Sequence, residues 1–120
     1  MGTGIWGHAH GTGYVPGIDL VGYKVEATDG SIGKVDKHTE DVGRSYVVVD
    51  TGPWIFGRRV LIPAGLIVRV DAEDETVHLS CTRDHVKDSP DFAKHEREDE
   101  PTFVTMIENY YTNPHTGPHM

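Results

Sequence analysis

The sequence predicts a mainly β fold, a small antiparallel β-barrel with a short C-terminal α-helix. Between Tyr23 and Ser80, short runs rich in β-branched residues alternate with turn residues, a spacing typical of small β-barrels and sandwiches. No segment of that region has room for the crossover helix that a parallel pair of strands requires. Asp29-Gly30, a dipeptide favoured in tight hairpin turns, separates the first two runs. Consecutive strands are therefore expected to pair antiparallel.

Six strands are expected in this region. Their ranges are 23–27, 31–37, 45–51, 59–62, 67–71 and 76–80. The third is a continuous apolar run, which indicates a strand buried on both faces. In the fifth, Val68 and Val70 alternate with Arg69, so both valines are expected to face the core. Thr82 is placed to cap a short helical turn that follows the last strand.

A single helical pattern lies near the C-terminal end of the chain. Phe103, Met106, Ile107 and Tyr110 recur at the spacing of one helix face, which predicts an amphipathic helix over residues 102–111. A helix of about three turns is unstable alone in water, so this apolar face is expected to be buried. Two partners are open for it, the chain's own barrel and a second subunit.

The chain divides into five regions. A flexible glycine-rich segment covers residues 1–17, and the barrel domain covers residues 18–92. An acidic linker at 93–101, the amphipathic helix at 102–111 and a flexible tail at 112–120 follow. The many glycines of the first region raise the entropy cost of ordering it, so it is expected to be mobile unless something holds it.

The central pieces of the sequence follow a distinctive order. Residues 22–36 read GYKVEATDGSIGKVD, residues 46–52 read YVVVDTG, and residues 54–63 read WIFGRRVLIP. This order resembles the PRC-barrel family in its stand-alone bacterial form, over residues 18–92. The resemblance implies a PRC-type β-barrel. It also implies a non-catalytic interaction or assembly module, because related barrels in the reaction-centre H subunit and in a ribosome maturation factor act chiefly as docking domains.

Composition narrows the classes of function. The formal net charge of −8 repels a phosphate backbone, and Arg58-Arg59 is the only adjacent basic pair, so no nucleic-acid partner is expected. No apolar run reaches the ~20 residues of a membrane-spanning helix, and no signal-peptide pattern is present, so membrane insertion is not expected. The single cysteine, Cys81, fits a reducing compartment, and the protein is expected to be cytoplasmic.

No catalytic, cofactor-binding or metal-binding residue is predicted. Residues 2–7 match a dinucleotide-binding glycine pattern, but no strand pattern precedes them and no helical pattern follows. Two pairs of histidines near the chain ends have no carboxylate that can be assigned to orient them, which favours solvated side chains over a metal site. Cys81 and His78 are expected on opposite faces of the last strand, so they do not form a nucleophile–base pair. The chain is expected not to be an enzyme.

The aromatic turn at residues 52–57 is the strongest candidate for an interaction surface. It places three large apolar residues between glycines, although loops normally lie on the surface, and two arginines follow. The turn either folds over the barrel mouth or forms an exposed patch. The predicted interaction surface combines this turn with the helix face and comprises Trp54, Ile55, Phe56, Arg58, Arg59, Phe103, Met106, Ile107 and Tyr110.

We expect the chain to form a homodimer and to bind a further, unidentified protein partner. A core of this size is too small to cover both the aromatic turn and the helix face. A two-fold partner can cover both, because each subunit presents the same apolar surface to its copy. The alternative function is that of a small-ligand or metal-sensing binding protein, with its site at the barrel mouth or at the histidine-containing ends.

Overall fold

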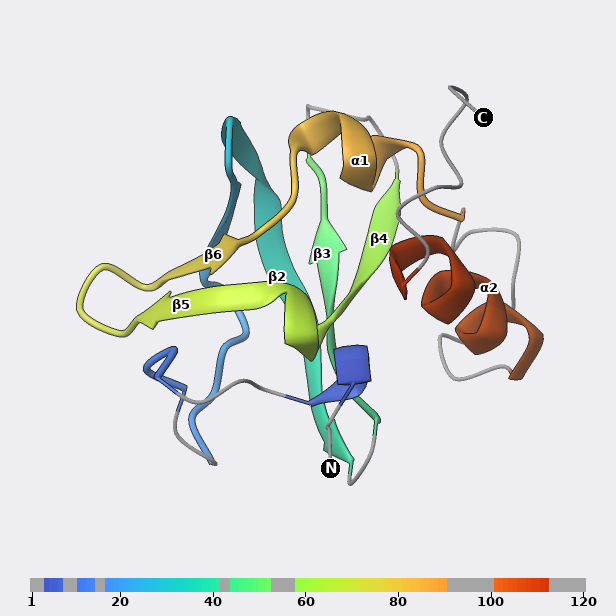
Figure 1. Cartoon of the computed structure of the whole chain (residues 1–120). Helices are drawn as coiled ribbons and strands as arrows, with labels where there is room; N and C mark the ends of the chain where they lie inside the picture. Colours follow the sequence, from blue (N-terminus) through green and yellow to red (C-terminus); the bar gives the residue numbers. More distant parts are fainter. Residues whose placement is uncertain are drawn as a thin grey trace.

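A computed structural model describes residues 4–7, 11–14, 17–41, 44–52, 58–90 and 101–112. Its six strands are β1 (Lys24–Ala27), β2 (Gly30–Asp41), β3 (Arg44–Asp50), β4 (Arg59–Pro63), β5 (Ile67–Asp71) and β6 (Thr76–Leu79) (Figure 1). Two 3-10 helices, η1 (Gly4–Trp6) and η2 (Ala64–Leu66), accompany two α-helices, α1 (Arg83–Lys87) and α2 (Pro101–Thr112). The mainly β class and the short C-terminal helix are confirmed. No helix in these ranges is long and apolar enough to span a membrane.

The six strands form one mixed sheet in the order β4-β3-β2-β1-β6-β5. All neighbours pair antiparallel except β1 and β6, which run parallel. The predicted antiparallel barrel is therefore wrong in two respects, because one pair is parallel and no pairing among the described strands closes β4 onto β5. The physical reason lies in η2, which turns the chain sharply after β4. The β5–β6 hairpin then lies at the far edge of the sheet beside β1 (Figure 1).

Apolar side chains gather on both faces of the sheet. Along β3, Val47 and Val49 belong to one cluster, whereas Tyr46 and Val48 belong to the other, as strand alternation requires. The inner cluster comprises Leu20, Tyr23, Val25, Ala27, Ile32, Val35, Val47, Val49, Val60, Ile62, Ile67, Val70, Val77, Leu79 and Val86. The outer cluster comprises Trp6, Tyr46, Val48, Leu61, Phe103, Val104 and Ile107. The predicted burial of the strand at 45–51 on both faces is confirmed for residues 46–49, whereas Ser45 is half-buried and Asp50 is exposed.

Helix α2 packs on its own chain, since it supplies three residues of the outer cluster. Phe103 and Ile107 are completely buried against the outward side chains of β3 and β4. Met106, which the helical periodicity predicts to be buried, is 41 % exposed. The buried stripe runs through Phe103, Val104 and Ile107, which places Met106 on its flank. Tyr110, at the other end of the predicted face, is half-buried.

The N-terminal segment contributes to the same packing. Trp6 is buried, meets the ring of Tyr46 edge-on at a centroid distance of 6.3 Å, and donates a hydrogen bond from Nε1 to Oε1 of Glu108 at 3.1 Å. The backbone of Ile5 passes close to η2, where a Cβ added at Gly65 would lie 2.7 Å from Cα of Ile5. This part of the segment predicted to be flexible is therefore held by α2, β3 and η2.

Strand β5 departs from the predicted alternation. Its register against β6 shifts between Ile67 and Arg69, a β-bulge that places one extra residue in the strand. Val68 is consequently 51 % exposed, so the prediction that it faces the core is wrong. Val70 is buried as predicted, because the shift lies before it.

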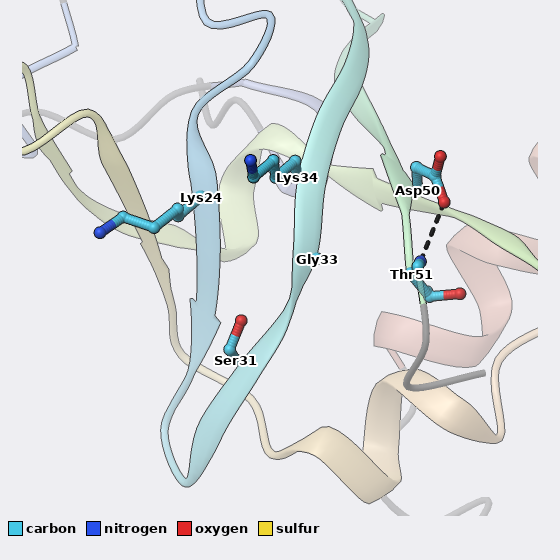
Figure 2. A pocket seen from close by; sticks show the side chains of 7 residues that line it. Lys24, Ser31, Gly33, Lys34, Asp50 and Thr51 are labelled. Carbon is cyan, nitrogen blue, oxygen red and sulfur yellow. Dashed lines mark hydrogen bonds between the residues drawn. The ribbon is translucent and has the colours of Figure 1, made fainter. Parts of the chain in front are cut away.

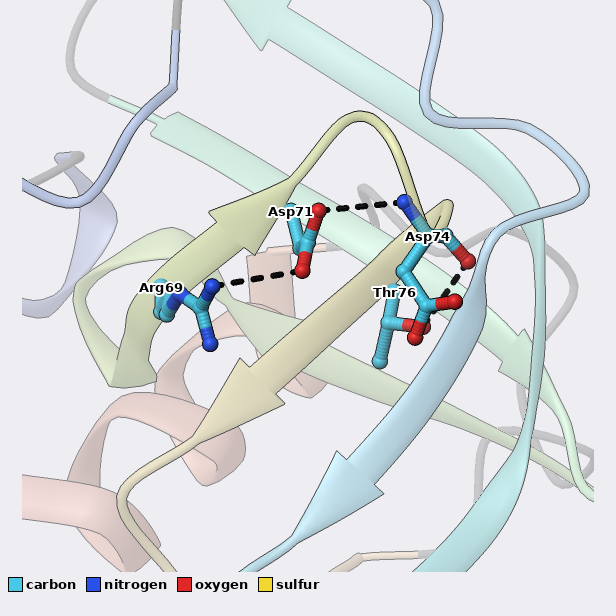
Figure 3. Close-up of polar contacts among 4 residues, drawn as sticks. All are labelled: Arg69, Asp71, Asp74 and Thr76. Carbon is cyan, nitrogen blue, oxygen red and sulfur yellow. Dashed lines mark hydrogen bonds and ion pairs between the residues drawn. The ribbon is translucent and has the colours of Figure 1, made fainter.

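The charged turn between β5 and β6 is held by its own polar groups (Figure 3). Asp71 accepts one hydrogen bond from the Arg69 guanidinium at 3.2 Å and another from the backbone N–H of Asp74 at 3.0 Å. The hydroxyl of Thr76 donates to the carbonyl of Asp74 at 3.1 Å. These contacts fix where β6 begins, and therefore the level at which Thr76 pairs with Lys24 of β1.

Helix α1 starts at the predicted cap. The Thr82 hydroxyl accepts a hydrogen bond from the backbone N–H of His85 at 3.1 Å, which satisfies one of the unpaired donors of the first turn. A carboxylate oxygen of Asp29, in the β1–β2 turn, accepts from the backbone N–H of Arg83 at 2.8 Å. The hairpin turn and α1 are thereby tied together at one end of the sheet.

Candidate functional site

The outer face of the sheet carries a hollow beyond the area that α2 covers. Asp50 lies on the same face as Tyr46 and Val48 by strand alternation, so the hollow begins where the outer cluster ends. Its volume is about 310 Å³, near the lower end of the range for small-molecule pockets. Its lining, drawn in Figure 2, comprises Lys24, Ser31, Gly33, Lys34, Asp50, Thr51 and Gly52.

Gly33 lies at the centre of this lining, between the β1 side and the β3 side (Figure 2). Its φ is +146°, and a Cβ at this position would overlap the backbone carbonyl of Asp50 on the neighbouring strand. Only glycine permits β2 and β3 to approach so closely here. The glycine therefore sets the spacing of β2 and β3 at the base of the hollow.

Two lysines stand on neighbouring strands at the edge of the hollow. A register shift between Val25 and Glu26 places Lys24 of β1 directly opposite Lys34 of β2 (Figure 2). Like charges in this arrangement repel each other and destabilise a sheet. Neither ammonium group makes a hydrogen bond or an ion pair within the part of the chain that the structure describes.

Ser31 adds a third donor to the β1–β2 side of the hollow. It is the first residue after Gly30 and pairs with Glu26, two steps from the lysine pair, with Val25 and Gly33 between them. Its hydroxyl, like the two ammonium groups, has no hydrogen-bond partner among the residues with described structure. This side of the hollow therefore presents free donors, with two acidic residues beside them, because Glu26 pairs with Ser31 and Asp50 pairs with Lys34.

On the β3 side of the hollow, in contrast, the polar side chains form hydrogen bonds within the chain. Asp50 accepts a hydrogen bond from the backbone N–H of Gly52 at 2.9 Å (Figure 2). The Thr51 hydroxyl donates to the backbone carbonyl of Arg58 at 2.6 Å, across the base of the turn at 53–57. The hollow is therefore polarised, with free donors on the β1–β2 side and one carboxylate on the β3 side.

The two arginines of the predicted interaction surface have different roles. Arg58 donates from its guanidinium to the backbone carbonyls of Lys87 and Ser89, so it secures the end of α1 to β4. Arg59 forms an ion pair with Asp36 at 2.9 Å, with both side chains about half exposed. Such an exposed pair is screened by water and contributes little. Arg58 is thus a structural residue, whereas Arg59 stays accessible beside the hollow.

The helix residues of the predicted surface are mostly committed to the fold. Phe103 and Ile107 are completely buried in the outer cluster, so they are not part of an exposed surface in this chain. The Tyr110 hydroxyl donates to the backbone carbonyl of His85 at 2.6 Å, which links α2 to α1. Met106 alone of the helix set is exposed. Trp54, Ile55 and Phe56 lie outside the described residues.

Cys81 lies just beyond β6 and is partly buried against the inner cluster. Burial raises the pKa of its thiol to about 11, and Asp29 nearby acts in the same direction. A thiol with so high a pKa stays protonated near neutral pH, and the thiolate is the reactive form of cysteine. Within the described ranges, no group of three His, Cys, Asp or Glu side chains is close enough together to hold a metal ion.

Comparisons with known proteins concern the fold. No protein-family model matches the chain, and no curated protein matches it. The crystal structure of a putative 16S ribosomal RNA processing protein, RimM from Pseudomonas aeruginosa, is similar with a TM-score of 0.48 at 19 % sequence identity. The similarity covers 58 % of this chain and 47 % of that protein, so it spans less than half of that protein's length. At this sequence identity the similarity concerns the fold alone. The resemblance to PRC-type barrels is therefore also one of fold only.

The prediction of no nucleic-acid partner is contradicted by this comparison, because the protein with the similar fold is named for the processing of ribosomal RNA. The prediction depended on a net charge of −8, which is a property of the whole chain. Binding depends instead on the local potential. Lys24 and Lys34 show that a positive site can form on an acidic chain when the strands bring distant lysines together.

Sequence reasoning missed Lys24, Ser31 and Lys34. A signal was present, because Asp29-Gly30 predicts a hairpin that brings the flanking strands together. A regular hairpin in the observed register of Ala27 with Gly30 would place Lys24 opposite Gly33. The bulge moves Lys24 opposite Lys34 instead, and its local signal is Gly33, an isolated glycine inside a strand pattern.

Proposed function

We propose that the chain is a non-catalytic interaction domain that docks a partner protein on the outer face of β1 and β2. The observation that carries this proposal is that Lys24 and Lys34 stand opposite each other at the edge of a hollow. Neither side chain has a partner in the described chain. Opposed like charges weaken a sheet. A bound anionic group would offset that cost, because it interacts favourably with both ammonium groups.

The position of the lysine pair favours docking over a structural role. Helix α2 covers the part of the outer face that β3 and β4 form, and it leaves the Gly33 hollow uncovered. Charged groups at an interface chiefly determine which partner is accepted and how fast it associates. An acidic segment of a partner protein fits the lysines on the β1–β2 side of the hollow by charge, and Arg59 of β4 adds a further cation on the far side, across from Asp50.

The absence of catalysis remains part of the proposal. It is supported by Cys81, whose buried thiol is held in the unreactive protonated form by its raised pKa.

The homodimer also remains a proposal, and fewer residues support it than the sequence indicated. Phe103 and Ile107 are buried within one chain, so a two-fold contact would use the other members of the predicted surface, such as Arg59, Met106 and the aromatic turn at 52–57.

Binding of a small ligand is a second candidate function. It is favoured by one observation, the volume of the hollow, because about 310 Å³ is enough to take a small molecule. Docking and ligand binding use the same donors, and they differ in whether the anionic group belongs to a protein.

Affinity capture from a native lysate tests the docking proposal. Wild-type chain is compared with a variant carrying Lys24→Glu and Lys34→Glu, and with the control Lys87→Glu, which reverses an exposed lysine of α1 outside the hollow. We expect a protein that is enriched by wild type and by the control, and lost with the double variant. Nuclease treatment must leave that complex intact. Equal capture by all three chains would contradict the proposal, and loss on nuclease treatment would assign the face to nucleic acid.

A further inference from the structure

We infer that the Gly33 hollow binds a phosphate monoester, the doubly charged phosphoryl group of a phosphorylated side chain or of a small phosphorylated molecule. This inference rests on the proposed docking face for its location only. The features that support it are the free donors, the double charge of the phosphoryl group and the volume of the hollow.

The free donors on the β1–β2 side match the acceptors of a phosphoryl group. Lys24 and Lys34 each carry three N–H donors, and Ser31 carries one O–H donor. None of these side chains has a partner in the described chain. A phosphoryl group offers three strong acceptor oxygens, and lysine binds it as a compact point charge. One group could therefore accept from both strands of the hairpin at once.

Charge favours a dianion over a monoanion at this place. A phosphate monoester carries about −1.5 to −2 at pH 7, so it attracts each ammonium group more strongly than a single negative charge does. A carboxylate carries one negative charge, and it would leave half of the repulsion between Lys24 and Lys34 in place. Asp50 pairs with Lys34 across β2 and β3, so it offsets part of that lysine's charge and repels either anion, and the phosphoryl group is expected toward Lys24 and Ser31.

The shape of the hollow gives the group room without a rearrangement of the strands. Gly33 presents no side chain at the centre of the lining, and the close approach to the Asp50 carbonyl excludes any larger residue there. The volume of about 310 Å³ exceeds what one phosphoryl group needs, so the rest of a small ester or peptide has space beside it. The lysine stems supply apolar walls for that remainder.

Isothermal titration calorimetry of the full chain with inorganic phosphate, at low ionic strength and pH 8, tests the inference. We expect saturable binding that Lys24→Gln, Lys34→Gln and Ser31→Ala each weaken by roughly three- to tenfold, the range of a partly exposed charge-assisted hydrogen bond. Asp50→Asn is expected to tighten binding by a similar factor, because it removes the repelling carboxylate. The matched control Lys87→Gln should leave the dissociation constant unchanged.

Further probes distinguish the source of the phosphoryl group. A phosphoserine pentapeptide that binds more tightly than glycerol phosphate would identify a protein source, and the reverse order would identify a small molecule. Three results would overturn the inference: acetate binding as tightly as phosphate, binding unaffected by the lysine variants, or weaker binding by Asp50→Asn. Tighter, lysine-dependent binding of a single-stranded RNA decamer would also overturn it, in favour of phosphodiesters. If phosphate fails while capture from lysate still requires both lysines, the docking proposal stands and this inference falls.

Discussion

Gly33 shows how one residue determines both the fold and the site. The position is occupied by glycine because β2 and β3 approach too closely there for a Cβ, and this close approach brings Asp50 and Thr51 into the lining of the hollow. The lysines beside it are surface residues with no structural partner in the described chain. For single residues of β2, stability therefore depends on the backbone at Gly33, whereas binding depends on the side chain of Lys34.

Gly33→Ala is therefore expected to destabilise the chain by about 2 kcal/mol or more, because the new Cβ would overlap the Asp50 carbonyl and force the strands apart. Gly17→Ala is the matched control, since Gly17 also has a positive φ, of +93°, but no atom lies within 4 Å of the added Cβ. Its cost should be smaller, about 1–2 kcal/mol, from the backbone conformation alone. Denaturant unfolding measures both changes, and equal losses would contradict the role of the close approach.

Cys81 offers a residue-scale test of the non-catalytic proposal. Burial raises the pKa of its thiol to about 11, so at pH 8 the native protein should react with a thiol reagent far more slowly than the unfolded chain. The sign of the effect on stability follows. Because the thiol of the unfolded chain ionises first, the free energy of unfolding should fall as the pH rises from 9 toward 11. Rapid modification of the native thiol at pH 8 would refute the protonated state.

Among the elements, α2 is the one whose position the structure explains most fully. A helix of twelve residues is marginal alone, and it is stabilised here by Phe103 and Ile107 on the outer face of the sheet. Trp6 then covers the same cluster from the N-terminal side and bonds to Glu108. The two ends of the described chain thus meet on one face of β3 and β4.

Substitutions of Trp6 test this packing. Trp6→Ala should destabilise the fold by about 3 kcal/mol, through the lost burial of a large ring. Trp6→Phe keeps much of that ring but removes the Nε1 hydrogen bond to Glu108, and should cost about 1 kcal/mol beyond the small change in volume. Chemical unfolding followed by far-ultraviolet circular dichroism measures both. The control Met106→Ala changes an exposed residue of α2 and should stay within about 0.5 kcal/mol.

Ile107→Asp separates packing within one chain from packing between two. The carboxylate would be buried without a partner in the outer cluster, so α2 should detach or the chain should unfold. Because α2 packs in its own chain, the loss should not depend on protein concentration. Thermal unfolding at several concentrations checks this, and a midpoint for wild type that rises with concentration would indicate a contact between subunits instead.

On the scale of the whole molecule, the strands were predictable and their arrangement was only partly so. Alternation and turn residues locate each strand, and the continuous apolar run at β3 correctly indicates a strand with two buried faces. The parallel pairing of β1 with β6 was not predictable, because it depends on how η2 turns the chain after β4. Local pattern carries no information on such long-range pairing, so a closed antiparallel barrel was expected where an open mixed sheet exists.

The candidate site could not be predicted from the sequence for a similar reason. Lys24 and Lys34 are ten positions apart, and only the bulge at Val25 places them opposite each other. Phe103 and Ile107, in contrast, stood out by their periodicity, but the same periodicity describes a core face and an interaction face equally well. The net charge of −8 gave the wrong expectation for nucleic acid in the same way. It is a sum over all residues, so it does not show that two lysines stand together on one part of the surface.

The central claim is that the anionic partner is bound at the Gly33 hollow and not on α2. Two-dimensional amide NMR of the full chain during titration with a phosphoserine pentapeptide tests it most directly. The predicted result is saturable shift changes centred on residues 31–34 and 50–52, which line the hollow, and their loss in the Lys24→Gln, Lys34→Gln double variant. Shift changes centred on residues 103–112, or a saturable response that survives the double variant, would contradict the account.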